Sequence, residues 1–413
     1  MPQPPRTASG RTSGRAGLIA ASVAVGTAAV ALIGAAGFTA MVARRIVTPP
    51  RRRDADIRIL AVDRDPAGGE PDTITISATA DTVVPGRYGL WFDDDRGYAR
   101  MGDILERSGE RVVRELLSVE SGVLVPGLRG RISGWVHRHP RELGVPVEEV
   151  VVDTEGGPAP AWLVPAEEGT GRWVVQVHGR AAARGETIRA VPVFREAGYS
   201  SLIISYRNDP EAPPSPDGRY GLGDTEWRDV EAAVEFAVER GATEIVLMGW
   251  SMGGASVLQA AMRMAPQRQE LLRGIVLESP VVDWYTTLEF QAATLRVPRA
   301  MRLGALSAIS SRWGRLVTGQ SAPIDLRAMD LVTRHLELVL PTLILHSDDD
   351  GFVPATASRA LADARPDIVR LEAFDTARHV KLWNYDRERW EGAVRRWLSE
   401  RDAIARTAQS ARR

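Results

Sequence analysis

A serine at position 251 lies in a stretch whose residues could carry out nucleophilic chemistry. The sequence Gly249-Trp250-Ser251-Met252-Gly253 has the G-x-S-x-G pattern. An apolar run over 244–248 precedes it and predicts a buried strand, and the run over 255–262 after it predicts a helix. A serine in such a sharp turn is exposed above the sheet, and the helix N–H groups face the charge that develops during attack. This context indicates a nucleophile; the alternative is a serine in an ordinary glycine-rich turn.

A serine hydroxyl needs a base within hydrogen-bond reach and a third group that orients the base. The chain has six histidines, and three of them follow Ser251. Of these, His379 lies in the loop after the last predicted strand, where a side chain can reach the carboxyl edge of a parallel sheet. We therefore predict His379 as the base and expect the acid in the run Asp348–Asp350. For His335 and His346 we expect ordinary packed or surface positions.

The elements that must position these groups begin near residue 147. From there short apolar strands alternate with helices, which predicts a mostly parallel sheet covered by helices on both faces. We assign this α/β unit to residues 147–402. Residues 282–335 interrupt the alternation just after the nucleophile and are expected to form a cap, the alternative being an extra pair of packing helices. Residues 403–413 are a polar, arginine-rich tail that we expect to fray.

The stretch 147–402 resembles the α/β-hydrolase superfamily, in particular the prolyl-oligopeptidase-like and dienelactone-hydrolase-like serine hydrolases. Three motifs match in order and are followed by His379: His178-Gly179, Gly249-Trp250-Ser251-Met252-Gly253 and His346-x-x-x-Asp350-x-x-Val353-Pro354. The resemblance implies Asp350 as the acid. Because Ser347 replaces the usual glycine and two further aspartates precede Asp350, Asp348 is the second choice. The chain as a whole also resembles membrane-anchored actinobacterial hydrolases.

The oxyanion site should consist of two backbone N–H groups. One belongs to Met252, the residue after the nucleophile. By resemblance the other belongs to Arg180, in the loop after the strand over 173–177. The Arg180 or Arg184 side chain could bind a substrate carboxylate, the alternative being an ion pair with an acid such as Glu186. The candidates for substrate contacts at the pocket are Arg184, Asn208, Tyr220 and Trp250.

Composition excludes several other kinds of chemistry. The net charge of the 413-residue chain is -1, so no overall electrostatic field attracts nucleic acid to it. The chain has no cysteine, which excludes disulfides and thiolate chemistry. A triad mechanism implies no metal and no organic cofactor. His137 and His139 could share a strand face toward a metal, but with no third ligand nearby we expect solvated histidines.

An uncharged run over residues 16–43 follows a polar, arginine-containing start. The run is longer than the ~20 residues needed to cross a bilayer. We predict a transmembrane helix within an N-terminal region over 1–53, which gives a single-pass membrane protein bound to the lipid bilayer. The flanking arginines slightly favour a cytoplasmic body, but the side remains open. The alternative is a cleaved signal peptide and secretion.

Residues 54–146 form a separate region of short alternating stretches divided by turn residues, which predicts a small, mainly β domain. No catalytic group is evident in it.

These features predict a membrane-tethered serine hydrolase that cleaves an ester, a thioester or an amide through an acyl-enzyme. A carboxylesterase is favoured, because the β domain is too short for the propeller that filters peptides in prolyl oligopeptidases. A serine peptidase of that type, or an acyltransferase, is the alternative. The alternative outside enzymes is a binding module that has a hydrolase fold but catalyses no reaction. The substrate is a small acyl compound or a peptide.

Overall fold

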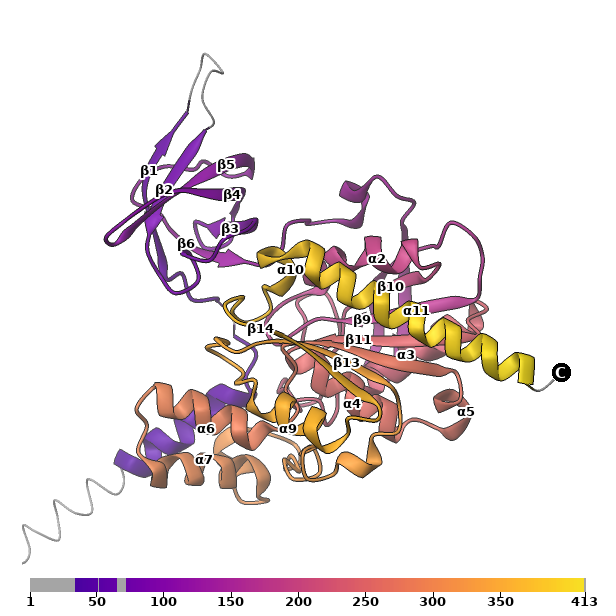
Figure 1. Cartoon of the computed structure of the whole chain (residues 1–413). Helices are drawn as coiled ribbons and strands as arrows, with labels where there is room; N and C mark the ends of the chain where they lie inside the picture. Colours follow the sequence, from indigo (N-terminus) through magenta and orange to yellow (C-terminus); the bar gives the residue numbers. More distant parts are fainter. Residues whose placement is uncertain (1–33, 51, 65–71, 412–413) are drawn as a thin grey trace, which may run out of the picture.

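The computed structural model describes residues 34–50, 52–64 and 72–411. The described chain forms a β-barrel that stands beside one end of a larger sheet, with helices on both faces of the sheet (Figure 1). The architecture of the larger part is the α/β-hydrolase fold.

The barrel is closed by six strands in the order β1-β2-β5-β4-β3-β6. Their bounds are β1 Ile57–Asp63, β2 Thr73–Ser77, β3 Tyr88–Phe92, β4 Gly97–Ser108, β5 Arg111–Ser121 and β6 Arg129–Ser133. Alternate side chains point inward, as Ile74 and Ile76 do in β2. Because β1 pairs with both β2 and β6, no strand edge is left open for pairing with another chain.

The second sheet has eight strands in the order β14-β13-β12-β11-β9-β10-β8-β7. They are β7 Glu148–Thr154, β8 Gly157–Val164, β9 Arg172–Val177, β10 Ser200–Ile204, β11 Glu244–Trp250, β12 Leu272–Glu278, β13 Thr342–Ser347 and β14 Val369–Phe374. In this order every pair of adjacent strands between β14 and β10 is parallel. Strand β8 is antiparallel to both of its neighbours, β10 and β7. Parallel strands place the loops that follow them along one edge, where the predicted site residues lie.

Helices cover both faces of this sheet (Figure 1). One core includes side chains of α3 (Trp227–Glu239), α4 (Met252–Arg263) and α9 (Thr356–Ala364). The other core includes side chains of α2 (Val191–Glu196), α10 (Leu382–Tyr385) and α11 (Arg387–Ala411). Among them are three buried tryptophans near the C-terminus: Trp383, Trp390 and Trp397.

The predicted insertion between two strands is a group of helices: α6 (Trp284–Thr294), α7 (Arg299–Ser310) and α8 (Arg315–Thr318). Asp283 caps α6 by accepting hydrogen bonds from the amides of Tyr285 and Thr286 at 2.8 and 2.9 Å. The group reaches the site edge, since Gln291 donates a hydrogen bond to the carbonyl of Phe352 at 3.1 Å. We call these helices the cap.

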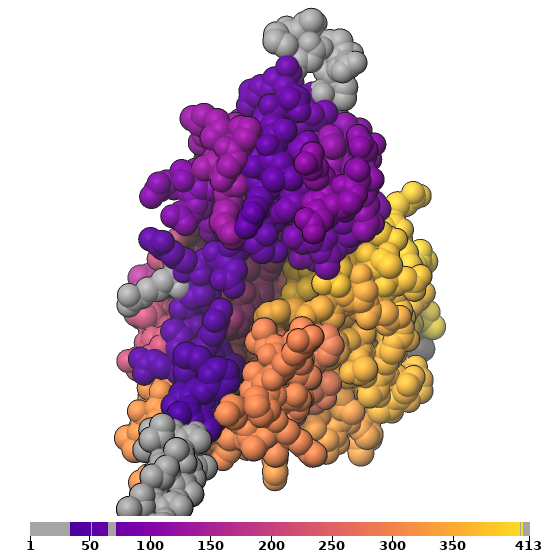
Figure 2. All heavy atoms as spheres, turned by 90° about the vertical axis from the view of Figure 1, so that its left-hand side faces the viewer, coloured from indigo at the N-terminus to yellow at the C-terminus, as the bar shows by residue number. Residues whose placement is uncertain are grey.

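A helix over residues 34–47 lies beside the cap at the start of the described chain (Figures 1 and 2). Its Ala43 and Val47 side chains are fully buried in the core that covers one face of the eight-stranded sheet. Among the described residues, no helix has the length and apolar character needed to cross a membrane. Most of the predicted span, residues 16–33, lies outside the described residues.

A buried carboxylate, Glu278, connects the elements around the site. It ends β12, next to Trp250 of β11. Its side chain accepts hydrogen bonds from the indoles of Trp250 and Trp390, both at 2.9 Å, and from the Arg189 guanidinium at 3.3 Å. Its backbone carbonyl accepts the Ser251 amide at 3.1 Å. A fully buried carboxylate is tolerated because donors from several segments surround it.

The structure differs from the predicted elements at several points. The predicted helix over 186–197 is a 3-10 helix, η2 (Arg184–Ala190), followed by the short α2. The predicted terminal helix over 383–402 is interrupted at Asp386 into α10 (Leu382–Tyr385) and α11, and α11 continues through the predicted tail to Ala411. Strands β1 and β4 were not predicted, because neither shows a clear period-two pattern. In β1 the run Ile59–Val62 is apolar on both faces, and in β4 a buried first half is followed by a mostly exposed second half.

We expect Glu278→Gln to lower the free energy of unfolding by about 2–4 kcal/mol, measured by urea denaturation. The substitution leaves the buried Arg189 guanidinium without its anionic partner, and breaking a buried pair in this way is costly. The matched control is Glu148→Gln, which removes an exposed ion pair with Arg240 and should change stability by less than about 0.5 kcal/mol. Equal stability of the two variants would contradict the role assigned to Glu278.

Candidate active site

Ser251 occupies the turn between β11 and α4 in a strained conformation. Its φ is 50° and its ψ is -117°, outside the regions that side-chain-bearing residues normally adopt. The flanking glycines make the turn possible, because a methyl group at Gly253 would collide with the carbonyls of Val177 and His178. The local pattern of sequence thus produces the sharp turn that it predicted.

His379 lies between Ser251 and Asp350. Its Nε2 is 3.1 Å from the Ser251 hydroxyl, and its Nδ1 is 2.7 Å from an Asp350 carboxylate oxygen. Because a carboxylate only accepts hydrogen bonds, Nδ1 carries the proton and Nε2 is left to accept the serine proton. The structure therefore brings together the three residues that the sequence selected.

Asp350 is held as an anion. Its other oxygen accepts the amides of Phe352 and Val353, both at 2.8 Å, and His346 lies 3.4 Å from the oxygen that faces His379. Burial alone would raise the pKa of Asp350, but His379 and His346 outweigh it and hold the pKa well below its usual range. An ionised acid is what the Nδ1–H of His379 requires.

The other two aspartates of the run have other partners. Asp348 is partly exposed and forms a two-pronged ion pair with Arg359, with contacts of 2.7 and 2.6 Å. Asp349 accepts the Ser347 hydroxyl at 2.7 Å and the Arg378 amide at 2.9 Å. Neither contacts His379, so the structure favours Asp350 over Asp348 as its partner. His346 is packed, as expected, with its ring between the Ser358 hydroxyl and the Val353 carbonyl.

The loop after β9 passes close to the nucleophile, since a methyl group at Gly179 would lie 3.1 Å from the Ser251 Cβ atom. The amides on either side of Arg180 are engaged: Gly179 donates to Glu186 at 3.0 Å and Ala181 donates to the Tyr220 hydroxyl at 3.2 Å. Met252 is the first residue of α4, where helix amides point toward the site.

A buried histidine, His178, holds the start of the loop after β9 in place. The two ring nitrogens of His178 face the Asp209 carboxylate at 2.8 Å and the Gly179 carbonyl at 2.9 Å, and the ring stacks on Tyr206. Both partners only accept hydrogen bonds, so the ring holds two protons. Burial lowers the pKa of His178, but Asp209 outweighs that effect and raises it.

The loop that carries His379 is fastened to the barrel. Asp81 of the barrel accepts a hydrogen bond from the Arg378 guanidinium at 3.1 Å and from the Lys381 ammonium at 3.2 Å. Arg378 and Val380, on either side of His379, have positive φ values of 61° and 53°. Residues in this left-handed region need support from their surroundings, and Asp81 supplies part of it.

The barrel in turn fixes the segment that contains Asp81. The buried guanidinium of Arg114 donates to the carbonyls of Thr82, Val84 and Gly86 at 2.9, 3.0 and 2.6 Å. The sequence offered no signal for this arrangement, because Asp81 and His379 are brought together only by the docking of two separately folded parts.

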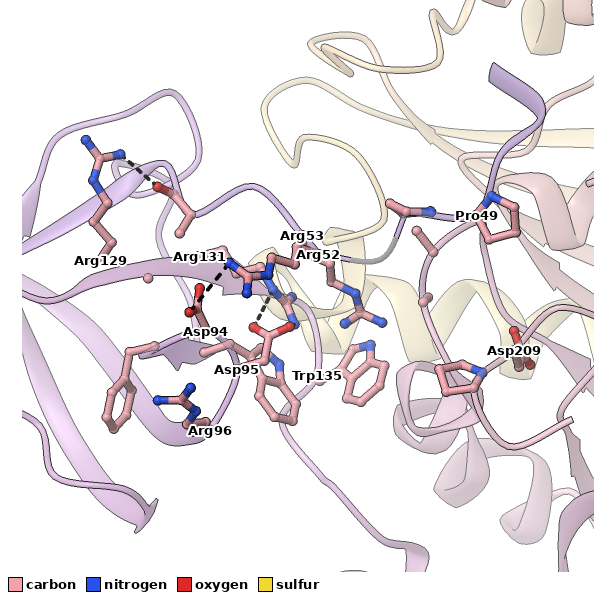
Figure 3. Close-up of a pocket in the computed structure, with 18 of the residues that line it drawn as sticks. Pro49, Arg52, Arg53, Asp94, Asp95, Arg96, Arg129, Arg131, Trp135 and Asp209 are labelled. Atoms are coloured by element: carbon pink, nitrogen blue, oxygen red, sulfur yellow. Dashed lines mark hydrogen bonds and ion pairs between the residues drawn. The ribbon is translucent and has the colours of Figure 1, made fainter. Parts of the chain in front are cut away.

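A cavity of about 540 Å³ lies where the barrel, the linker after residue 47 and the loop after β9 meet (Figure 3). Tyr220 and Asn208, both predicted as substrate contacts, line it together with Ala181 and Ala182 of the loop. Figure 2 shows a hollow between the barrel and the cap on this side of the molecule.

Three other side chains proposed for substrate contact are engaged elsewhere. Trp250 is fully buried beneath the turn and donates to Glu278, so it does not face a substrate. Arg184 lies over the Trp162 ring and pairs with Glu211 at 2.9 Å rather than with Glu186. The Arg180 guanidinium donates to the carbonyls of Arg45 and Thr48, both at 3.0 Å, which ties the loop to the N-terminal segment.

The histidines of the β region also have local partners. His139 caps the 3-10 helix η1 (Pro140–Leu143) and contacts Glu149 at 2.8 Å, and His137 lies 3.5 Å from Glu142. No group of three or more metal-ligating side chains is present among the residues that the structure describes.

Comparison with protein families gives two matches. The model of the prolyl oligopeptidase family matches residues 190–401, and a domain of unknown function (DUF8805) matches residues 58–133. No curated protein matches the sequence at a significant level.

Similar folds occur in solved structures. The esterase Pf2001 of Pyrococcus furiosus is 17% identical, with a TM-score of 0.49 over 64% of this chain and 94% of its own. Est1E of Butyrivibrio proteoclasticus with ferulic acid is 18% identical, with a TM-score of 0.45 over 62% and 99%. A bromoperoxidase of Bacillus anthracis is 20% identical, with a TM-score of 0.43 over 61% and 100%.

We expect Asp81→Asn to slow the labelling of Ser251 by a fluorophosphonate about 10- to 100-fold, because small displacements of a base are costly. Global stability should change by less than about 1 kcal/mol, because the ion pairs of Asp81 are partly exposed. The control is Glu120→Gln, which removes a barrel ion pair with Arg100 of similar exposure, away from the His379 loop. Equal labelling rates for the two variants would show that the barrel contact does not position His379.

Proposed function

The chain belongs to the prolyl oligopeptidase family of serine hydrolases, and we propose that Ser251, His379 and Asp350 are its catalytic triad and that its substrate is a carboxylic ester. The observation that carries the proposal is the position of His379, with one ring nitrogen on the serine hydroxyl and the other on a buried, ionised carboxylate.

In the proposed reaction, the Ser251 hydroxyl attacks the ester carbonyl carbon while His379 Nε2 takes its proton. Asp350 stabilises the resulting imidazolium through Nδ1–H. The carbonyl oxygen becomes an oxyanion, for which the amides of Met252 and Arg180 are the proposed donors. His379 then protonates the departing alcohol, and an acyl group remains on Ser251.

A water molecule completes the cycle. His379 takes its proton as the water oxygen attacks the acyl carbonyl, and the second tetrahedral intermediate breaks down to the carboxylic acid and free Ser251. Another acceptor in place of water would make the protein an acyltransferase through the same first half-reaction.

Two features support an ester over a peptide. The barrel is a single six-stranded unit rather than a propeller, and Ser251 is only 5% exposed, which favours a small substrate. An alkoxide is also a better leaving group than an amide anion, so an ester depends less on the protonation that His379 supplies. Membership of the family keeps a peptide bond as the second candidate, and a panel of chromogenic esters and aminoacyl amides separates the two.

We also propose that residues 16–43 tether the protein to a membrane, on the strength of their length and lack of charge. Ala43 is buried in the protein core, so the bilayer contact must end before it. A cleaved signal peptide is the competing explanation, and the mass of the mature N-terminus separates the two.

The triad is tested by substitution. We expect Ser251→Ala to lower kcat on a chromogenic ester by about 10³- to 10⁶-fold and to abolish fluorophosphonate labelling. Asp350→Asn should lower kcat strongly, because the amide no longer favours the required tautomer of His379. The matched control is Asp348→Asn, whose ion pair with Arg359 is remote from His379, and its kcat should change less than tenfold.

Retained turnover in Ser251→Ala would reject the nucleophile. A larger loss in Asp348→Asn than in Asp350→Asn would reject the acid. If the folded protein neither reacts with a fluorophosphonate nor cleaves any ester or amide, the hydrolase fold acts as a binding module.

A further inference from the structure

The cavity beside the oxyanion loop has an unbalanced charge. Five arginines line it, against three aspartates: Arg52, Arg53, Arg96, Arg129 and Arg131, with Asp94, Asp95 and Asp209. Asp209 is paired with His178 and Asp95 with Arg131 at 2.9 Å. Arg52 lies 4.0 Å from Asp94, and Arg96 lies 3.7 Å from Asp93. Among the described residues, Arg53 and Arg129 are therefore the lining arginines that have no carboxylate partner.

Arg53 is the notable member of this group. It lies over the Trp135 ring at 5.6 Å and forms no hydrogen bond or ion pair with any residue that the structure describes. Arg131 shares the cavity wall, and Figure 3 shows both side chains with Trp135 at the edge of the barrel. A guanidinium without a carboxylate, beside an aromatic ring, is a suitable partner for an anionic ligand.

The cavity is close enough to the nucleophile to hold part of a substrate. Ala181 lines it and is two residues after Gly179, where a methyl group would lie 3.1 Å from Ser251 Cβ. Since consecutive Cα atoms are 3.8 Å apart, the cavity wall begins within about 12 Å of the nucleophile.

We propose that this cavity binds an anionic group, a carboxylate or a phosphate, at the end of the substrate away from the scissile ester, with Arg53 as its main contact. The inference rests on the proposed ester hydrolase function and names its substrate class. It also gives the barrel and the linker a part in specificity, because Arg53 and Arg131 come from those segments.

The test compares two chromogenic esters of equal chain length, 4-nitrophenyl hexanoate and the 4-nitrophenyl half-ester of adipic acid. In Arg53→Gln, the ratio of kcat/KM for the adipate ester to that for the hexanoate ester should fall about 10- to 100-fold, because a charged hydrogen bond is lost. Arg53→Lys should restore part of the ratio. Succinate and suberate half-esters measure the reach, and a phosphonate-terminated ester separates phosphate from carboxylate.

Arg240→Gln is the control, since it removes an exposed arginine that follows α3 and pairs with Glu148 of β7. An unchanged ratio in Arg53→Gln, with both esters still cleaved, would overturn the anionic pocket and leave the proposed function intact. Failure of the wild-type protein to cleave either ester or to react with a fluorophosphonate would instead overturn the proposed function.

A second inference comes from the outer surface of the cap. Several large apolar side chains are exposed there: Leu295, Leu303, Trp313, Leu316 and Val317, with Trp313 at 83% and Leu316 at 82%. Residues 290–324 contain five arginines and no acidic residue. We call the exposed part of this segment the cap face.

The cap face adjoins the point where the described chain begins. Gly304 of α7 lies against Thr39 of the N-terminal helix, because a methyl group at Gly304 would come within 2.9 Å of the threonine methyl. Phe38 and Met41 of that helix are 40% and 57% exposed. Of the five arginines, Arg302 pairs with Glu289 at 3.3 Å. Apolar side chains, an exposed tryptophan and a surplus of arginines together are typical of a surface at a membrane interface.

We infer that the cap face rests on a bilayer that contains anionic lipids, with Trp313, Leu316 and Val317 in the headgroup region. This inference rests on the proposed membrane tether, which places a bilayer next to the N-terminal helix. The cap would then contact the lipid surface from which an acyl substrate enters the site.

The absence of cysteine allows a single-site test on the full chain. Leu316→Cys labelled with a nitrobenzoxadiazole dye should be quenched by nitroxide-labelled lipids when the protein is reconstituted in vesicles with phosphatidylserine. The same dye at Val151→Cys, 53% exposed on β7, should be quenched by aqueous iodide instead. Each of Arg312→Gln and Arg315→Gln should weaken the phosphatidylserine dependence about fivefold.

Quenching of the Leu316→Cys dye by iodide would overturn the inference. Protection from both quenchers would also overturn it, since the occupant would then be another protein segment or a second copy of the chain. Carbonate extraction tests the tether by itself. If carbonate releases the protein from membranes, the tether is rejected, and the cap face can still be tested by adding vesicles to the released protein.

Discussion

The arrangement of the elements around the site depends on one buried carboxylate, that of Glu278. Moving a carboxylate out of water is unfavourable unless donors surround it. Here the donors come from the nucleophile strand, the C-terminal helix α11 and η2, so the charge can be buried only when all three are in place. The Leu382 amide, three residues after His379, approaches the same carboxylate at 3.3 Å. The positions of the proposed nucleophile and the proposed base therefore depend on one shared acceptor.

The barrel completes this arrangement from outside the sheet. Asp81 holds the basic residues that flank His379, and Arg189 also donates to the Gly134 carbonyl, at the end of the barrel. Asn384 adds hydrogen bonds to Arg87 and Gly134. The contact between the two parts is thus polar and specific, and it is concentrated at the loop with His379. The loop that carries the proposed base is therefore supported from the barrel, across the boundary between the two parts.

The sequence predicted those features that arise from local patterns. The glycines around Ser251 and the regular alternation of strands and helices specify the turn and the parallel sheet with little help from the rest of the chain. Asp350 could be selected because its spacing from His346 follows a motif, and the partners of Asp348 and Asp349 explain why neither of those two contacts His379.

The features that the sequence could not predict depend on distant contacts. Glu278 appeared only as the end of a strand, since its donors lie up to 112 residues away. Trp250 was considered a substrate contact because it is next to Ser251, yet alternation along β11 directs it into the core. Arg180 and Arg184 were considered for a substrate carboxylate because of their charge, and both are used by neighbouring segments instead.

The N-terminal segment has a consequence for the order in which the protein is made. Arg45 and Thr48 accept the Arg180 guanidinium, and Val47 accepts the Tyr220 amide. Their partners emerge from the ribosome more than 130 residues later. The barrel, complete by Ser133, can close while this segment is still without partners. The segment around Arg45–Thr48 must therefore wait, without these partners, until the loop after β9 and then Tyr220 have been synthesised.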